Sequence, residues 1–127
     1  MKKKTIFAAA LFITVCVVAL ILTACNATDF ERRLIKEGYE VSGDYVKGDI
    51  DPDEEGEEYC GIVWYLNGYR QNSDQTVNSV VIYKYDTAQH AKAAEKIFKR
   101  EADGSFNVVR KNNILILGDE QGVKDAQ

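Results

Sequence analysis

Histidine is almost absent from this chain, whose 127 residues include one, His90. A catalytic Ser, Thr or Cys is activated by a base beside it, most often a histidine. No motif such as G-x-S-x-G places a nucleophile near His90. His90 also falls in the first turn of a predicted helix, where the helix dipole disfavours a cationic side chain. We therefore expect His90 on a helix surface, and a protein that is not an enzyme and has no cofactor.

Basic residues are in the minority, with 16 Lys and Arg against 20 Asp and Glu. Binding to nucleic acid requires clustered positive charge that neutralises the phosphates. The acidic balance therefore predicts that nucleic acid is not a partner.

The one long apolar run lies at the N-terminus, where residues 5–24 carry no charge and follow three lysines. A run of this length can cross a bilayer as a helix. A basic start and an apolar middle are also typical of a secretory signal peptide. The four residues Leu22-Thr23-Ala24-Cys25 favour the signal peptide.

These four residues resemble the lipobox of bacterial lipoproteins, which reads Leu, two small residues and Cys. The resemblance implies that the Cys25 thiol receives a diacylglyceryl group and that the chain is cut before Cys25. Two acyl chains anchor a protein stably, whereas one holds it marginally. We expect a signal peptide at 1–24, a lipidated cysteine and tether at 25–28, and a single small domain at 29–127 on the outer face of the cell membrane. An uncleaved membrane helix and plain secretion are the alternatives.

Processing at this site would leave Cys60 as the one free thiol, because Cys16 departs with the signal and Cys25 is lipidated. The mature chain could then form no internal disulfide, and we expect Cys60 to be a small buried hydrophobe. Cleavage removes three of the 16 basic residues and none of the 20 acidic ones, which leaves a net charge of −7.

The rest of the chain alternates between helical and extended patterns. A capping box from Thr28 to Glu31 predicts a first helix that ends near Glu37, an Ala-rich stripe predicts the main helix over 86–101, and Asp119 can cap a last short one. The expected strands are 39–45, 59–66, 76–85, 106–110 and 114–117. This order predicts an α+β domain: a mostly antiparallel sheet of about five strands with helices on one face, in two layers.

Three features of the strand sequences predict how the strands pack. Alternation in the second strand puts Cys60, Ile62, Trp64 and Leu66 on its core face. Asn67-Gly68 is a strong turn signal and predicts the end of that strand. Residues 80–83 are apolar on both faces, which predicts a central strand.

An acidic stretch between the first two predicted strands contains a partial metal-binding motif. Asp51, Asp53 and Glu55 match positions 1, 3 and 5 of an EF-hand loop, but Ile62 stands at position 12, where a bidentate Glu belongs. The interpretations are a loose calcium site and a solvated run of charge, and we favour the run of charge. We therefore expect no metal.

Tyrosine is the most suggestive residue class, with seven of them between positions 39 and 85. On an open sheet face, Tyr59, Tyr65, Tyr83 and Tyr85 could stack on sugar rings or dock a peptide. The alternative is ordinary cross-strand packing by residues that favour strands. We take these four as the candidate binding face.

Residues 80–98, a Tyr-rich strand that passes into an Ala- and Lys-rich helix, resemble small lipoproteins in which an α+β domain follows the anchor. That resemblance implies no activity. We expect a membrane-anchored extracytoplasmic binding or interaction module with a protein or glycan partner. The alternative is an envelope inhibitor or accessory factor of a partner enzyme or assembly.

Overall fold

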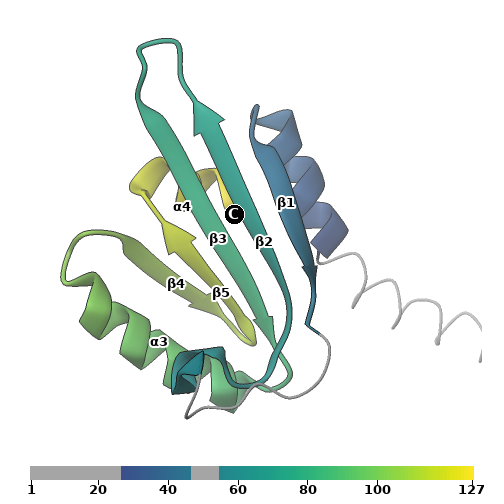
Figure 1. The fold of residues 1–127 in the computed structure, drawn as a ribbon, viewed down its shortest axis with the longest axis vertical. Coiled ribbons are helices and arrows are strands. Elements are labelled where there is room, and N and C mark those ends of the chain that lie inside the picture. Colours follow the sequence, from purple (N-terminus) through teal and green to yellow (C-terminus); the bar gives the residue numbers. More distant parts are fainter. Residues whose placement is uncertain (1–26, 47–54) are drawn as a thin grey trace, which may run out of the picture.

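A five-stranded antiparallel sheet organises the chain in the computed structural model, which describes residues 27–46 and 55–127 (Figure 1). The strands stand in the order β1-β2-β3-β5-β4. Their bounds are β1 Glu40–Tyr45, β2 Ile62–Gln71, β3 Val77–Tyr85, β4 Asn107–Lys111 and β5 Ile114–Gly118. The described helices are residues 27–36, the 3-10 turn η1 (Glu57–Tyr59), α3 (Ala88–Ala102) and α4 (Glu120–Ala126). The predicted α+β class with five antiparallel strands is confirmed.

Helices cover both faces of the sheet, so the predicted placement on one face is wrong. Ile114 and Ile116 of β5 pack in one cluster with Val123 of α4 and Leu34 of the first helix. Leu115 and Leu117 pack in another cluster, which contains Ala91, Ala94 and Phe98 of α3. Because successive strand residues point to opposite faces, α3 lies on one side of the sheet and the other two helices lie on the opposite side (Figure 1).

β3 is the middle strand of the five, as its apolar residues on both faces predicted. β5 beside it is buried on both faces, from Ile114 to Leu117. The chain reverses between β4 and β5 at Asn112, whose φ of 55° lies in the left-handed region that Asn tolerates. The two strands of this hairpin match the strands predicted at 106–110 and 114–117.

The two C-terminal helices begin at side-chain caps. Asp119 caps α4, as predicted, by accepting a hydrogen bond from the Gly122 amide. α3 begins two residues later than expected, because the Thr87 side chain, not Asp86, caps it by accepting from the His90 amide. No helix among residues 27–46 and 55–127 is long and apolar enough to cross a membrane.

β2 departs from its predicted pattern at both ends. An irregularity between Ile62 and Trp64 shifts the register, so that Ile62 joins the α3 cluster while Trp64 and Leu66 face the other helices. Cys60 precedes the strand and is half-buried, not a core residue of it. At the far end, Asn67-Gly68 makes no turn, and the strand continues to Gln71.

Close packing explains why Gly68 belongs to the strand. A Cβ built on Gly68 would lie 3.0 Å from Val80 Cγ1 and 3.2 Å from Leu34 Cδ1. A glycine therefore lets the first helix approach the sheet. The reversal between β2 and β3 comes at residues 72–76 instead, where Asp74 accepts hydrogen bonds from the amide and hydroxyl of Thr76.

Candidate binding face

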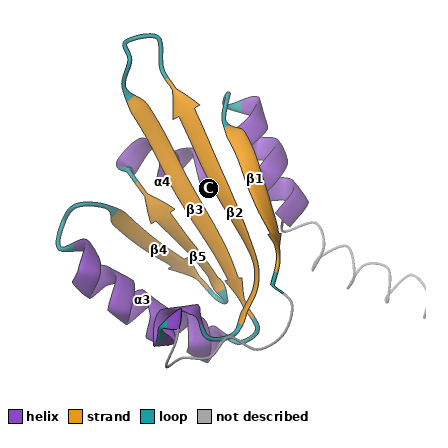
Figure 2. Ribbon diagram, in the orientation of Figure 1, coloured by secondary structure: helices purple, strands orange, loops and turns teal. Residues whose placement is uncertain are grey.

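Part of the sheet on the α3 side is not covered by any helix of residues 27–46 and 55–127. α3 contacts β3, β4, β5 and η1, and it crosses the end of the sheet away from the β2–β3 turn (Figure 2). The register puts two tyrosines of β2 and two valines of β3 on the uncovered area. We call these residues the open sheet face: Tyr65, Tyr69, Val77 and Val81.

The open sheet face is accessible to a partner. Tyr69 is 47% exposed and Val77 is 46% exposed, while Tyr65 and Val81 are half-buried. The four residues come from adjacent strands, and both valines are diagonal neighbours of Tyr69 in the β2–β3 register. An aromatic side chain can reach such diagonal neighbours. Contiguous apolar area on a protein surface often marks an interaction site, whereas single exposed apolar residues are common and need no explanation.

Acidic side chains border the open sheet face along β1. Glu40 is opposite Tyr69 and Asp44 is opposite Tyr65 in the β1–β2 register, and both acidic residues are exposed. Within β1–β3, these two carboxylates are the charged groups that the register places on this side. The border therefore favours a partner that carries positive charge.

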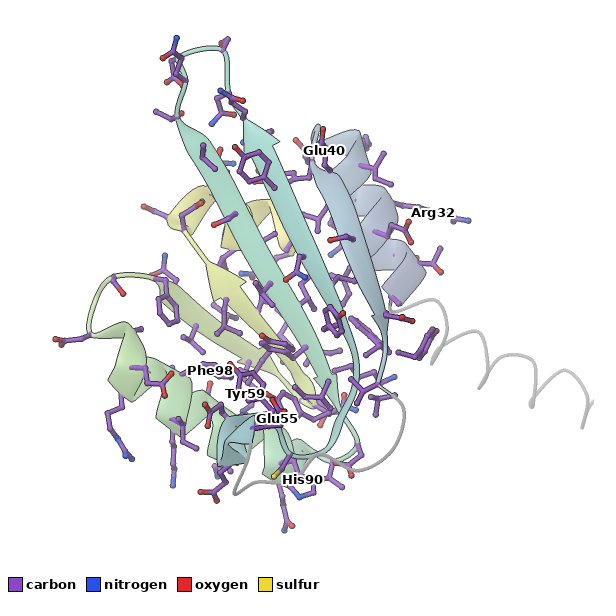
Figure 3. All side chains as sticks on the ribbon, viewed as in Figure 1. Arg32, Glu40, Glu55, Tyr59, His90 and Phe98 are labelled. Carbon is purple, nitrogen blue, oxygen red and sulfur yellow. The ribbon has the colours of Figure 1, made fainter. Side chains whose placement is uncertain are left out.

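Three of the four predicted tyrosines pack against one another and against α3. The Tyr83 ring is stacked on Phe98 at 5.9 Å between centroids, and the Tyr59 ring meets both of them edge-on at about 6 Å (Figure 3). Tyr85 is fully buried, and its hydroxyl donates to the Glu58 carbonyl at 2.6 Å. Tyr85 cannot be part of an exposed face, and of the four only Tyr65 lies on the open sheet face.

Burial also sets the ionisation of this cluster. It raises the pKa of Tyr83 to about 12, with the Tyr59 and Glu58 charges adding to the effect. Burial raises the pKa of Tyr59 and that of Tyr85 as well. All three hydroxyls therefore keep their protons at neutral pH, and they serve in packing and hydrogen bonding.

Tyr69 was missed because the turn signal ended its predicted strand, whereas Val77 lay within the predicted strand 76–85 and was missed because only tyrosines were considered for the face. Asn67-Gly68 predicted a turn, which removed Tyr69 from β2. The polar segment that follows hid the extension of the hairpin. The missed signal is the alternation of Tyr65, Asn67 and Tyr69, which continues through the glycine.

His90 lies on the surface of α3, as predicted, and its Nδ1 is 2.6 Å from Asp86 Oδ1. This hydrogen bond lowers the pKa of Asp86. Among the described residues, no group of three or more His, Cys, Asp or Glu side chains is arranged to hold a metal ion. Of the partial calcium motif, Glu55 is exposed, whereas Asp51 and Asp53 lie outside the described residues.

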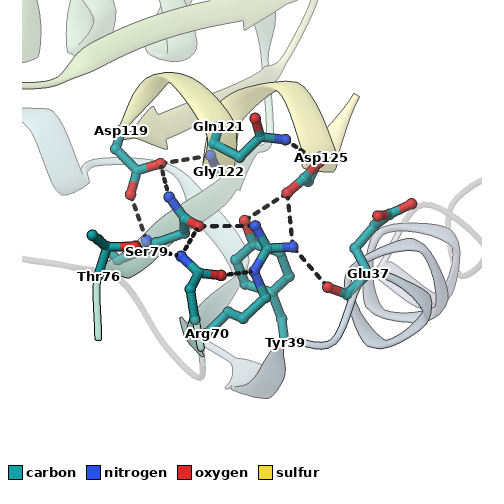
Figure 4. Close-up of polar contacts among 11 residues, drawn as sticks. Glu37, Tyr39, Arg70, Thr76, Ser79, Asp119, Gln121, Gly122 and Asp125 are labelled. Carbon is teal, nitrogen blue, oxygen red and sulfur yellow. Dashed lines mark hydrogen bonds and ion pairs between the residues drawn. The ribbon is translucent and has the colours of Figure 1, made fainter. Parts of the chain in front are cut away.

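The densest polar network ties three elements together around Arg70 (Figure 4). The Arg70 guanidinium lies over the Tyr39 ring at 4.6 Å, donates to the Glu37 carbonyl and pairs with Asp125 at 3.3 Å. It also donates to Asn72 and Asn78 within its own hairpin. Because the guanidinium is engaged on all sides by the chain itself, this network holds the fold together and is not a ligand site.

No family model, curated protein or solved structure matches the chain.

Proposed function

We propose that the protein is a lipid-anchored, extracytoplasmic binding module that docks a partner protein on its open sheet face, and that it is not an enzyme. The accessible apolar area formed by Tyr65, Tyr69, Val77 and Val81 carries this proposal. Tyrosine is enriched at protein interfaces because a flat, rigid ring gives large contact area and its hydroxyl stays hydrated at the rim. The carboxylates of Glu40 and Asp44 favour basic residues around the partner's contact surface.

Anchoring would make a modest affinity sufficient. A lipid on Cys25 would confine both the module and any membrane-bound partner to one surface, which raises their effective concentration. The tether would be short, because the first helix is already formed at residue 27.

Site-specific photo-crosslinking in the native membrane tests the docking face. A benzoylphenylalanine replaces Tyr69 in one variant and Tyr45 in the matched control. Tyr45 is also exposed, at 57%, but points to the opposite side of the sheet. We expect one protein to be captured from position 69 and not from position 45.

A second crosslinking position tests whether the captured protein binds the open sheet face. A benzoylphenylalanine in place of Val77 should capture the same protein, and Tyr65→Ser with Tyr69→Ser in that background should reduce capture strongly. Equal capture from positions 69 and 45, or capture that ignores the serine substitutions, would contradict the docking face. If the captured protein is an enzyme whose rate the module changes, the module is an inhibitor or accessory factor.

Cys25→Ser tests the anchor. Because the thiol carries the lipid in the proposed pathway, the variant should remain unlipidated and uncleaved between residues 24 and 25. The measurement is metabolic labelling with a fatty acid together with the mass of the membrane-bound chain. Normal labelling and processing of the variant would refute the lipobox.

A further inference from the structure

The two outer strands of the sheet each have one free edge in the described part of the chain, because β4 pairs only with β5 and β1 only with β2. The Tyr85 amide donates to the Asn113 carbonyl, and the direction of hydrogen bonding alternates from residue to residue along each antiparallel strand. Followed through β5 into β4, this alternation turns the backbone N–H and C=O groups of Val108 and Arg110 away from the sheet. No described residue bonds to these groups.

β1 presents a second row of outward backbone groups at the opposite edge. The Val46 amide, just past the strand, donates to the Val63 carbonyl, so alternate residues of β1 face β2 and those between them face outward. The outward residues are Val41, Gly43 and Tyr45. The Tyr45 amide donates to the Asp44 carboxylate at 2.7 Å, and the other two amides have no partner among the described residues. An edge strand of this kind can bind a strand of another chain.

The free edge of β1 is acidic. β1 contains no basic residue, and its Glu40 and Asp44 are exposed. Glu31 of the first helix lies at the same edge, since it lines one pocket together with Gly43 and Tyr45.

The free edge of β4 is basic. β4 contains no acidic residue and carries Arg110 and Lys111. Lys99 of α3 lies near Arg110, because Glu95 forms ion pairs with both of them. Two β1 edges or two β4 edges would bring like charges together, whereas a β1 edge and a β4 edge attract each other.

We propose that the protein associates with a second copy of itself, with β4 of one copy paired to β1 of the other. Arg110 lies on the α3 side of the sheet, where it reaches Glu95, and Asp44 lies on that side too, opposite Tyr65. These two charges meet when both copies have the α3 side in common. Because all neighbouring strands of the sheet are antiparallel, β1 and β4 run in the same direction, and the two copies then join through a parallel pair.

The alternation of backbone groups fixes the register of this parallel pair. A residue whose backbone bonds toward the other strand lies opposite a residue whose backbone bonds away from it. The register that obeys this rule and pairs the whole of β4 sets residues 107–111 against residues 41–45 of the second copy. It places Arg110 opposite Asp44 of the second copy.

Arg110 has a free donor for this contact. Its Nε donates to Glu95 and its Nη1 to the Asn112 carbonyl, which leaves Nη2 without a partner among the described residues. Pairing also replaces the hydrogen bond that Asp44 accepts within its own strand. The Tyr45 amide would donate to the Arg110 carbonyl of the other copy, and the Asp44 carboxylate would accept from the Arg110 guanidinium.

The shapes of the two edges are complementary as well. A groove of about 470 Å³ lies between β4 and α4 on the side away from α3, and its lining includes Val109, Glu120, Val123 and Lys124. The first helix covers this same side of the sheet and extends beyond β1 (Figure 1). In the parallel pair, the first helix of the second copy lies over the groove, with Glu31 on the side of Lys124. This association goes beyond the docking of another protein, because it leaves Tyr69 and the rest of the β2–β3 hairpin uncovered.

Disulfide trapping between two differently tagged full-length chains in the native membrane tests the pairing. One chain carries Lys111→Cys and the other Tyr45→Cys, two exposed positions that the register sets opposite each other. Neighbouring strands lie about 4.8 Å apart, within the Cα separation of roughly 4.4–6.8 Å that a disulfide needs. Both chains carry Cys60→Ala, and chains without introduced cysteines report any cross-link through Cys16 or Cys25. We expect a mixed dimer on oxidation, and no dimer when both tagged chains carry the same substitution.

Tyr69→Cys in place of Tyr45→Cys is the matched control for collision. The two tyrosines are similarly exposed, at 47% and 57%, but Tyr69 lies away from both free edges. Lys111→Cys should therefore not be trapped by Tyr69→Cys.

Asp44→Asn in the Tyr45→Cys chain should lower the trapped fraction roughly twofold to fivefold, because it removes the charge opposite Arg110. Asp29→Asn, which removes the same charge at an exposed position of the first helix, should leave the fraction unchanged.

Four results would overturn the proposal. Dimers of Lys111→Cys alone or of Tyr45→Cys alone would mean that like edges meet. Equal trapping by Tyr69→Cys would mean random collision, and the absence of a mixed dimer would mean that the edges stay free. A trapped fraction that Asp44→Asn leaves unchanged would refute the contact between Asp44 and Arg110.

Discussion

Trp64 is the largest side chain that the sequence assigned correctly to the core. Its ring packs against Phe30 with centroids 6.2 Å apart, and it belongs to the cluster beneath the first helix and α4. The alternation of Trp64 with Leu66 was enough to predict this burial. The irregularity that moves Ile62 to the other face was not visible, because it depends on how β2 pairs with β3.

Trp64→Ala should lower the free energy of unfolding by roughly 3–5 kcal/mol, since it leaves a large cavity in the core. The measurement is urea unfolding followed by far-UV circular dichroism, because the substitution removes the fluorophore. Tyr45→Ala, at an exposed position of the neighbouring strand, should stay within about 0.5 kcal/mol. A Trp64→Ala effect below about 1 kcal/mol would mean that the indole is not part of the core.

The elements are joined by polar contacts as well as by the two cores. Arg70 on β2 links the end of the first helix to α4 through the Glu37 carbonyl and Asp125. The Tyr39 hydroxyl donates to the same Asp125 carboxylate at 2.8 Å. Residues from both ends of the described chain therefore meet on one side of the β2–β3 hairpin.

Arg70→Ala should destabilise the protein by roughly 1–3 kcal/mol, because it removes the ion pair with Asp125 and the part-buried hydrogen bonds to Asn72 and Asn78. The side chain of Arg70 is 20% exposed, so the effect should be smaller than for a fully buried ion pair. Arg32→Ala, at an exposed position of the first helix (Figure 3), is the matched control and should change stability by less than about 0.5 kcal/mol. Equal effects of the two substitutions in urea unfolding would contradict the structural role of Arg70.

At the scale of the whole molecule, buried tyrosines couple stability to alkaline pH. Burial raises the pKa of Tyr83 to about 12 and raises those of Tyr39 and Tyr85 as well. Above the ordinary tyrosine value of about 10, the unfolded chain loses these protons while the folded chain keeps them. Ionisation therefore stabilises the unfolded state, and the contribution of each tyrosine is lost as the pH rises from about 10 through its folded-state pKa.

We expect the free energy of unfolding to fall progressively between about pH 10 and pH 12 from this cause. Urea unfolding at a series of pH values measures it. Tyr83→Phe should make the decline shallower, whereas Tyr69→Phe on the open sheet face is the comparison variant. Identical pH profiles for the wild type and Tyr83→Phe would show that Tyr83 titrates alike in both states.

Periodicity and capping are local signals, and they were sufficient to predict most of the elements of this fold from the sequence. It predicted five strands, of which only β2 departs clearly from its expected bounds, together with α4 and its Asp119 cap and the central position of β3. It also supplies the whole basis for the anchor at Cys25, which remains a prediction.

Long-range packing sets which faces the helices cover and which tyrosines stay accessible. Those outcomes depend on contacts between residues far apart in the chain. Gly68 continues β2 because Leu34 and Val80 pack against it, and Tyr83 is covered because Phe98 of α3 stacks on its ring. Of the tyrosines predicted for the binding face, Tyr65 lies on the open sheet face and Tyr85 lies in the core. Tyr69 lies on the open sheet face although the sequence did not predict it there.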